Sequence, residues 1–198
     1  VEPPLRDAAT PALVHDYRAE GLLVYIKTLQ FDARGNPVIL YLTSKGHESG
    51  PKNDPRQWWT ARWTGKRWEV RAAVRSDHNY DFGPLHIEEA GTWRLIAPTE
   101  PGAQPYCTGG DMVMWTSRDQ GKTWRKVAQL TRDTARNHTY ARRPVEAHPD
   151  FYALWADGDA KKPSDSSLYF TKRNGSRVWR LPVEMTAEFE KPQPVPAR

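Results

Sequence analysis

Two short segments of the sequence pair a histidine with a tyrosine two residues later: DHNY at 77–80 and NHTY at 137–140. Histidine and tyrosine side chains can act as the general base and the general acid of a reaction. Arg142 follows the second segment, and a guanidinium binds a carboxylate through two parallel hydrogen bonds. Residues i and i+2 share one face of a strand, so the spacing predicts that each pair points in one direction. The candidate catalytic residues are therefore His78, Tyr80, His138, Tyr140 and Arg142.

A plainer interpretation stays open, because a histidine in a polar loop often serves only as a hydrogen-bonding group. The occurrence of the same pair in two segments favours a functional role. Four more residues are candidates for ligand binding, namely His47, Tyr106, Arg143 and Trp58. Trp58 could stack on a sugar ring or fill a core, Tyr106 could pack a loop, and Arg143 could form a structural ion pair.

The elements that must position these residues are short runs rich in β-branched and aromatic residues, divided by Gly, Pro, Asn and Asp. No segment of ten residues has a helical period. We expect twelve strands, near Leu22–Phe31, Pro37–Thr43, Gln57–Trp63, Arg67–Val74, Pro84–Glu89, Thr92–Ala97, Asp111–Trp115, Thr123–Leu130, His138–Arg143, Phe151–Trp155, Ser167–Thr171 and Val178–Val183.

A repeat groups these strands into fours. The segments WTGKRWEV, RDQGKTWRKV and KRNGSRVWRL each place a glycine turn before a tryptophan. Their tryptophans, Trp68, Trp124 and Trp179, are 56 and 55 residues apart. Four-stranded units with such a period are typical of β-propeller blades. The sequence thus predicts an all-β fold with a partial propeller at 1–183, blades at about 22–74, 84–130 and 138–183, and a Pro-rich tail at 184–198.

Three blades do not close a ring, because propellers usually have about four to eight. We therefore expect this chain to be part of a six- or seven-bladed ring whose other blades precede it. The chain does not begin with Met and shows no signal peptide, so it looks processed or truncated. The alternatives are a half-propeller that self-associates, a compact twelve-stranded sandwich, and chance spacing of hairpins.

The glycine turn joins the third and fourth strands of each unit. The turn between the first and second strands lies on the same face, and the remaining loops and links lie on the opposite face. The loops opposite this turn are longer and more polar, as binding loops tend to be. They contain or adjoin His47, His78, His138 and, with less support, His86. His148 falls on the turn face and is set aside.

The turn in the second unit reads S-x-D-x-G-x-T-W, the Asp-box of BNR-repeat, sialidase-like propellers. Its residues have structural duties: the carboxylate accepts turn N–H groups, the glycine adopts positive φ, and the tryptophan packs between sheets. A structural metal ion at the aspartate is an alternative. The motif residues are Ser117, Asp119, Gly121, Thr123 and Trp124.

A broader likeness covers most of the chain, on segments such as SDHNYDFGPL, APTEPGAQPYCTGG, NHTYARRPV and AHPDFYALWADG. The chain resembles bacterial BNR-4 proteins, including ulvan-lyase-like and rhamnosyl-glucuronate hydrolase propellers. That resemblance implies an exported, extracellular or periplasmic protein whose partner is an acidic polysaccharide. A lyase acting on a uronate by β-elimination is the leading function. A cation would neutralise the carboxylate, a base would remove the C5 proton, and an acid would protonate the leaving oxygen.

Two other functions stay open on the same scaffold: a rhamnosidase- or sialidase-like glycoside hydrolase, and a non-catalytic glycan-binding propeller. A hydrolase would use paired carboxylates. The candidates for these are Glu48, Asp54, Asp77, Asp81 and Glu100.

Composition narrows the range of partners. The chain has 198 residues and a net charge of +5, with basic residues too scattered to favour nucleic acid. No apolar run approaches the roughly 20 residues of a membrane span, so no membrane partner is expected. Cys107 is the only cysteine, which excludes an internal disulfide and a cysteine metal cluster. His47 and His78 lack a metal-ligand spacing, so we expect no catalytic metal or cofactor.

Overall fold

The computed structural model describes residues 9–196, which are almost entirely strands and loops. None of the described segments forms a helix that is long and apolar enough to cross a membrane. The elements are β1 (Leu23–Phe31), β2 (Pro37–Ser44), the 3-10 helix η1 (Pro51–Asn53), β3 (Arg56–Trp63), β4 (Trp68–Ser76), β5 (Leu85–Ile87), β6 (Trp93–Glu100), β7 (Asp111–Ser117), β8 (Arg125–Gln129), β9 (Asn137–Arg142), β10 (Ala153–Gly158), β11 (Leu168–Thr171), β12 (Val178–Arg180) and β13 (Gln193–Pro194).

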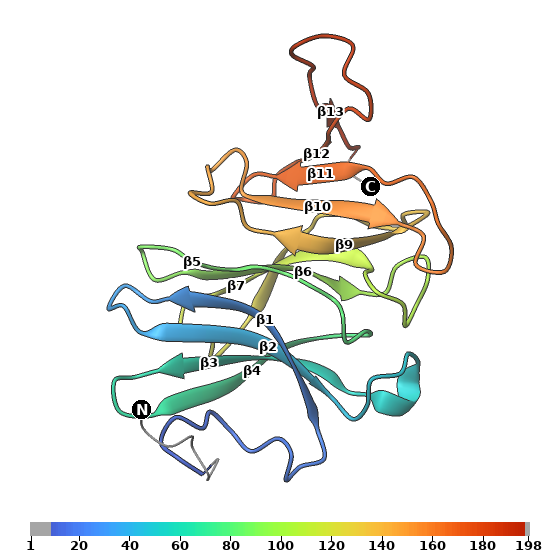
Figure 1. Cartoon of the computed structure of the whole chain (residues 1–198). Helices are drawn as coiled ribbons and strands as arrows, with labels where there is room; N and C mark the ends of the chain where they lie inside the picture. Colours follow the sequence, from blue (N-terminus) through green and yellow to red (C-terminus); the bar gives the residue numbers. More distant parts are fainter. Residues whose placement is uncertain (1–8, 197–198) are drawn as a thin grey trace, which may run out of the picture.

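The strands form three antiparallel sheets, each built from consecutive strands (Figure 1). The first sheet has the order β1-β2-β3-β4 and the second β5-β6-β7-β8. The third has the order β9-β10-β11-β12, extended at its edge by β13. The sheets follow one another along the molecule in chain order, so the predicted all-β architecture of four-stranded propeller blades is confirmed. The predicted strands match β1–β12 to within three residues at each end.

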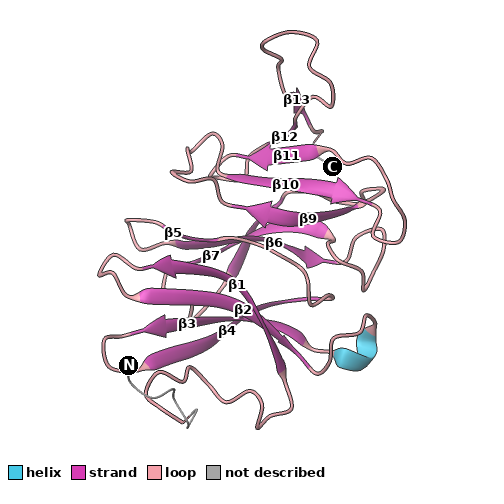
Figure 2. Ribbon diagram, viewed as in Figure 1, coloured by secondary structure: helices cyan, strands magenta, loops and turns pink. Residues whose placement is uncertain are grey.

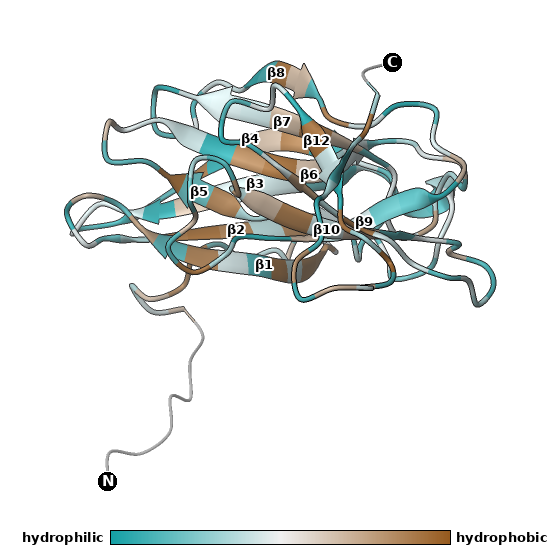
Figure 3. Cartoon of the chain, turned by 90° about the horizontal axis from the view of Figure 1, so that it is seen from above, coloured by the Kyte–Doolittle hydropathy of each residue, from teal (hydrophilic) through white to brown (hydrophobic). Residues whose placement is uncertain are grey.

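The core lies between successive sheets. Figure 3 shows apolar residues along several of the strands. Trp58 and Trp93 pack between the first and second sheets, and Trp155 and Met114 pack between the second and third. Trp58 is 0% exposed, and its indole Nε1 donates to Ser76 Oγ at 2.9 Å. The prediction that Trp58 binds a sugar is therefore wrong, because its ring is enclosed in the core.

The turn between β7 and β8, where the sequence predicts an Asp-box, is closed by side chains. Asp119 accepts hydrogen bonds from the backbone N–H of Thr123 at 2.9 Å and from its hydroxyl at 2.6 Å. Ser117 Oγ donates to Asp119 at 2.8 Å and accepts from Gly121 N at 2.8 Å. These donors, led by the Thr123 hydroxyl, lower the pKa of the Asp119 carboxyl. Trp124 packs against the core between the first two sheets.

Glycines in these turns set the distance between sheets. Gly121 has φ +84° and lies so close to the first sheet that a Cβ would be 2.8 Å from Thr60 Oγ1. Gly175 has φ +68° in the same turn of the third sheet, where a Cβ would be 2.8 Å from Ala128 Cβ of the second. Only glycine combines positive φ with this closeness at no steric cost.

The opposite end of the sheets carries the long loops, and we call it the loop end. It comprises the loops 45–55, 101–110 and 159–167 and the links 77–84 and 130–136 between sheets. The only helix that the described chain contains, η1, lies in the first of these loops and marks the loop end in Figure 2. The C-terminal tail returns to the third sheet, where Gln193 pairs with Arg180 and Val195 packs against the core.

Candidate functional site

The pair His78 and Tyr80 lies in a turn of the link 77–84 rather than in a strand. Asp81 closes this turn: its carboxylate accepts the backbone N–H of His78 at 3.2 Å and that of Gly109 at 2.8 Å. The carboxyl is fully buried, and burial raises its pKa to about 8. The turn is thus held to the neighbouring loop 101–110 of the second sheet.

His78 is fixed on both ring nitrogens. Nδ1 accepts the backbone N–H of Tyr80 at 3.2 Å and lies 3.1 Å from Thr108 Oγ1. Nε2 lies 3.2 Å from Ser49 Oγ. Because Nδ1 accepts a backbone N–H, the proton of the neutral ring is on Nε2. The ring is 7% exposed, and burial, with Arg56 and Lys27 nearby, lowers its pKa. His78 is therefore a positioned neutral donor.

Tyr80 stands beside this histidine and faces solvent. Its side chain is 54% exposed, with its ring centroid 5.7 Å from that of His78. The ring also contacts Tyr25 of β1 edge-on at 5.7 Å. The two-residue spacing does bring a histidine and a tyrosine together here, although a turn and not a strand does so.

A buried cation lies beneath the turn. Lys27 of β1 donates to the carbonyl oxygen of Asn79 at 2.6 Å, and its Nζ lies 5.6 Å from the Tyr25 ring centroid. Burial lowers the pKa of Lys27 to about 8, against the opposing effect of Asp81. Arg56 of β3 is buried as well, and it donates to Asn79 Oδ1 at 3.1 Å and pairs with Asp54 at 2.6 Å.

Sequence reasoning missed Lys27, Arg56 and Asn79, and it considered Asp81 only as one of the carboxylates of a hydrolase. One signal was present for Lys27, a lysine in the apolar strand LVYIKTLQF, where a lone cation marks a face that is not simply core. For Arg56 and Asp81 no local pattern exists, because their partners come from other loops.

The second pair is divided by a bulge. His138 of β9 is 3% exposed, whereas Tyr140 is 52% exposed. Tyr140 has φ +55°, and the register of β9 on β10 shifts between Leu154 and Ala156. An inserted residue breaks strand alternation. The expectation that His138 and Tyr140 share a face therefore fails.

His138 faces the third sheet instead. Its Nδ1 accepts Trp155 Nε1 at 2.9 Å, and its ring meets that of Tyr169 edge-on at 4.8 Å. Burial lowers the pKa of His138 to about 4. Within the described residues, no hydrogen bond, ion pair or ring contact joins His138 to the turn at 77–84, so the two histidines do not form one site. His86, also buried, stacks on Tyr152 at 4.0 Å and lies outside the candidate site too.

Arg142, which follows the second pair in the sequence, lies against the link that carries the first pair. Its guanidinium lies over the Phe82 ring at 3.7 Å and 5.9 Å from the Tyr140 ring centroid. Arg143 donates to Gln30 Oε1 at 2.5 Å. Arg142, Arg143 and Gln30 line a cavity of about 380 Å³, together with Phe82 and Thr28. Arg142 and Tyr140 are thus adjacent to the link that carries His78 and Tyr80.

The remaining predicted residues lie in the loops around the turn. Tyr106 has φ +59°, and its backbone N–H donates to Asp77 Oδ2 at 2.8 Å, which joins loop 101–110 to the link. His47 is exposed in the loop that supplies Ser49 to His78. Across residues 9–196, no three His, Cys, Asp or Glu side chains come together as a metal site would require.

Comparison with known proteins shows the fold. No protein-family model matches the chain, nor does any curated protein. Two solved structures are similar: a PL25 polysaccharide lyase described as an ulvan lyase, alone and bound to -[GlcA(1-4)Rha3S]-. Each superposes with a TM-score of 0.56 at 21% identity, over 77% of this chain and 33% of that one. The chain therefore spans about a third of the length of these structures and shares their fold.

Proposed function

We propose that this chain supplies the active site of a polysaccharide lyase that cleaves uronic-acid-containing glycans. One observation carries the proposal: the half-exposed phenol of Tyr80 stands beside the buried, neutral His78, above a buried lysine, at the loop end. The fold shared with an ulvan lyase, whose bound ligand contains glucuronate, supports the same reaction class.

The residues fit the three requirements of β-elimination. Tyr80 acts as the phenolate, after losing its proton to solvent: it takes the C5 proton, and the phenol so formed returns that proton to the leaving oxygen. As the C5–H bond breaks, its electrons form the C4–C5 double bond, and the C4–O bond breaks. Arg142, held on Phe82, is the donor for the uronate carboxylate, whose negative charge grows in the transition state, and His78, held by Ser49, positions the Tyr80 ring. Lys27 adds positive charge beneath the turn.

A hydrolase fits this region less well, because it needs two carboxylates that face the sugar. Asp81 is fully buried and holds backbone N–H groups, Asp54 is paired with Arg56, and Glu100 is paired with Lys126. Asp77 accepts the N–H of Tyr106. Glu48, the fifth candidate, is exposed in the loop that carries Ser49, but one carboxylate does not supply the pair that a hydrolase needs.

The wider setting is part of the proposal. We infer that the three sheets belong to a six- or seven-bladed ring over 1–183, with blades at about 22–74, 84–130 and 138–183 and a tail at 184–198. We also infer an exported protein whose substrate is an acidic polysaccharide. The Asp-box repeat and its resemblance to BNR proteins support both inferences.

The test is the ultraviolet absorbance of the unsaturated uronate that a lyase releases. The chain, alone and within its full-length protein, is incubated with ulvan and with other uronate polysaccharides. The expected result is a rise in absorbance that the Tyr80→Phe variant loses. New reducing ends without absorbance would show a hydrolase. Binding without any cleavage would show a glycan-binding protein, and either result would refute the lyase.

A further inference from the structure

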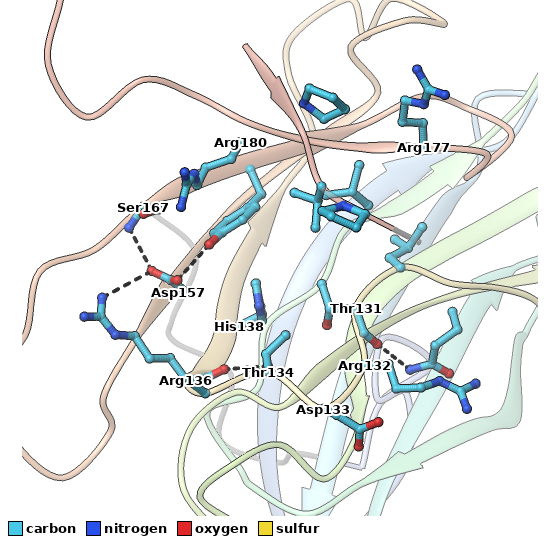
Figure 4. Close-up of a pocket in the computed structure, with 18 of the residues that line it drawn as sticks. Thr131, Arg132, Asp133, Thr134, Arg136, His138, Asp157, Ser167, Arg177 and Arg180 are labelled. Carbon is cyan, nitrogen blue, oxygen red and sulfur yellow. Dashed lines mark hydrogen bonds and ion pairs between the residues drawn. The ribbon is translucent and has the colours of Figure 1, made fainter. Parts of the chain in front are cut away.

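A second cavity, of about 1060 Å³, lies between the second and third sheets and is separate from the link 77–84. Its walls come from the link 130–136, from β10–β12 and from the tail at Pro194 and Pro196. Figure 4 shows His138 near the middle of the lining residues, with Arg132, Arg136, Arg177 and Arg180 around it. A cavity of this size can hold a small ligand or the end of a polymer.

The buried part of this cavity offers one directed donor. The Nδ1 atom of His138 accepts the indole N–H of Trp155, so the neutral ring carries its proton on Nε2. The ring is neutral at neutral pH, because burial lowers its pKa to about 4. Within residues 9–196, no oxygen accepts a hydrogen bond from Nε2. Nε2 is accessible from the cavity, so this donor can reach an oxygen atom that a ligand brings.

Four arginines and three aspartates line the cavity, namely Arg132, Arg136, Arg177, Arg180, Asp133, Asp157 and Asp165, so positive charge is in slight excess. Asp157 is already satisfied, since its carboxylate accepts Ser167 N at 2.7 Å and the Tyr169 hydroxyl at 2.9 Å, with Arg136 at 4.0 Å. Among the described residues, Arg132, Arg177 and Arg180 form no salt bridge with a carboxylate. Guanidinium groups that lack a carboxylate partner at a cavity rim attract carboxylate and sulfate groups.

The remaining wall is apolar and aromatic. The Tyr169 ring, Leu130 and Val178 lie beside His138, and the tail prolines close one side. Sugars pair an apolar ring face with hydroxyl oxygens, so this combination of surfaces matches a sugar ring better than it matches a small inorganic anion.

We propose that this cavity binds the acidic end of an oligosaccharide, with His138 Nε2–H donating to a sugar oxygen and the arginines holding a carboxylate or sulfate. The identity of the ligand rests on the proposed function. The cavity runs from the turn 175–177 to the link 130–136 at the loop end, where the Tyr80 turn also lies, so one polymer chain held in it could extend toward that turn. The cavity is a binding site and not a second catalytic centre, since a neutral histidine with Nδ1 occupied has no lone pair to accept a proton.

The experiment uses the Tyr80→Phe protein, so that the probe is not cleaved. A short glucuronate-containing oligosaccharide is titrated while the indole N–H signal of Trp155 is followed by NMR, because Trp155 is hydrogen-bonded to His138. We expect a saturable shift of that signal. Arg180→Gln should weaken binding roughly 3- to 10-fold, the loss of one charged contact at a solvent-exposed rim. His138→Phe should weaken binding by at least about 5-fold.

Lys66→Gln is the matched control, because it removes the same charge from the exposed turn of the first sheet, at the opposite end. Its affinity should equal that of the parent. Arg180 is exposed, so the Arg180→Gln variant should fold. If His138→Phe does not fold, the affinity of Arg180→Gln alone tests the proposed binding site. An unmoved Trp155 signal, unchanged affinity in Arg180→Gln, or equal binding of a neutral oligosaccharide of the same length would overturn the proposal.

The two proposals can fail separately. Loss of the unsaturated product in every assay, with a saturable Trp155 shift retained, would remove the lyase and keep the cavity as a glycan-binding site. Uronate cleavage by the wild-type protein with no Trp155 shift would keep the lyase and remove the binding site.

Discussion

The segments at 77–80 and 137–140 share a His-x-Tyr spacing, yet the fold uses them in opposite ways. In the first, a turn closed by Asp81 holds the His78 and Tyr80 rings 5.7 Å apart. In the second, a bulge leaves Tyr140 exposed and buries His138 against Trp155. The residue three positions after the histidine differs, Asp81 in one and Ala141 in the other. A carboxylate can bind backbone N–H groups and close a turn, whereas alanine cannot.

The comparison shows that the backbone conformation decides whether two side chains of a given spacing point in the same direction. Two histidines with one local motif become a positioned donor at a candidate active site and a donor in a separate cavity. The largest expected difference between them is in catalysis, and the smaller differences are in stability and positioning.

Replacing Tyr80 by Phe should give the largest effect. Removal of the proton-transferring hydroxyl should lower the rate of uronate cleavage by about 10²–10⁴-fold, the usual contribution of general acid–base catalysis. Steady-state release of unsaturated product measures the change. Tyr140→Phe is the matched control at the equivalent position, with an expected loss of less than about 10-fold. Equal losses in the two variants would break the comparison and restore both tyrosines to one site.

Removing the carboxylate that closes the first turn should destabilise the fold. Asp81→Ala leaves the buried N–H groups of His78 and Gly109 without an acceptor, so the free energy of unfolding should fall by about 2–4 kcal/mol. Urea denaturation gives the value. Asp81→Asn keeps one oxygen acceptor, so its loss should be smaller. If both variants lose equally little, the turn does not depend on Asp81.

Acidification should act through His138. Its pKa of about 4 in the folded protein lies below the value of 6.5 in the absence of burial. The unfolded chain therefore binds the proton more tightly. The stabilisation is fully present above about pH 6.5 and is lost as the pH falls toward 4, by about 3 kcal/mol in all. Urea denaturation between pH 7 and pH 4, roughly the window set by these two pKa values, should show a shallower fall in His138→Phe than in the wild type.

An equal pH dependence of unfolding in the wild type and in His138→Phe would contradict the burial of a neutral ring. An NMR titration gives an independent check, since the ring signals of His138 should keep their neutral-form positions to well below pH 6.5.

The smallest effect is expected from Ser49→Ala. This change removes the hydroxyl beside His78 Nε2 without opening the core, and loss of one neutral hydrogen bond should lower kcat/KM by about 2- to 10-fold. Assays at saturating and at low substrate separate kcat from KM. Trp155→Phe removes the matching partner of His138 and should leave kcat unchanged. A larger catalytic loss in Trp155→Phe than in Ser49→Ala would reverse the roles assigned to the two histidines.

The sequence predicted the strands and sheets well because their signals are local. Alternation, turn glycines and the Trp68, Trp124 and Trp179 repeat each act within a few residues. The positions of Gly65, Gly121 and Gly175 in equivalent turns, all with positive φ, follow from the same repeat. The strand β13 was missed because two residues of a Pro-rich segment carry no strand pattern.

The site was predicted only in part, because its determinants are not local. His78 and Tyr80 could be proposed from their spacing, but their support by Lys27, Ser49 and Thr108 depends on contacts across three elements. The bulge that separates His138 from Tyr140 depends on the pairing with β10, which the segment itself does not encode. Burial of Trp58 likewise follows from the stacking of two sheets.

The pairing of β13 with β12 also limits the aggregation of copies of this chain. An outer sheet edge exposes unpaired N–H and C=O groups that can recruit another strand. The outer strands of the first two sheets carry Arg71, Arg75, Arg125 and Lys126, so charge repels an incoming strand. The third sheet instead covers β12 with Gln193 and Pro194, and proline cannot donate a hydrogen bond to a further strand. Removal of the tail would thus expose the edge of β12 at Trp179 and Arg180, where another strand could pair.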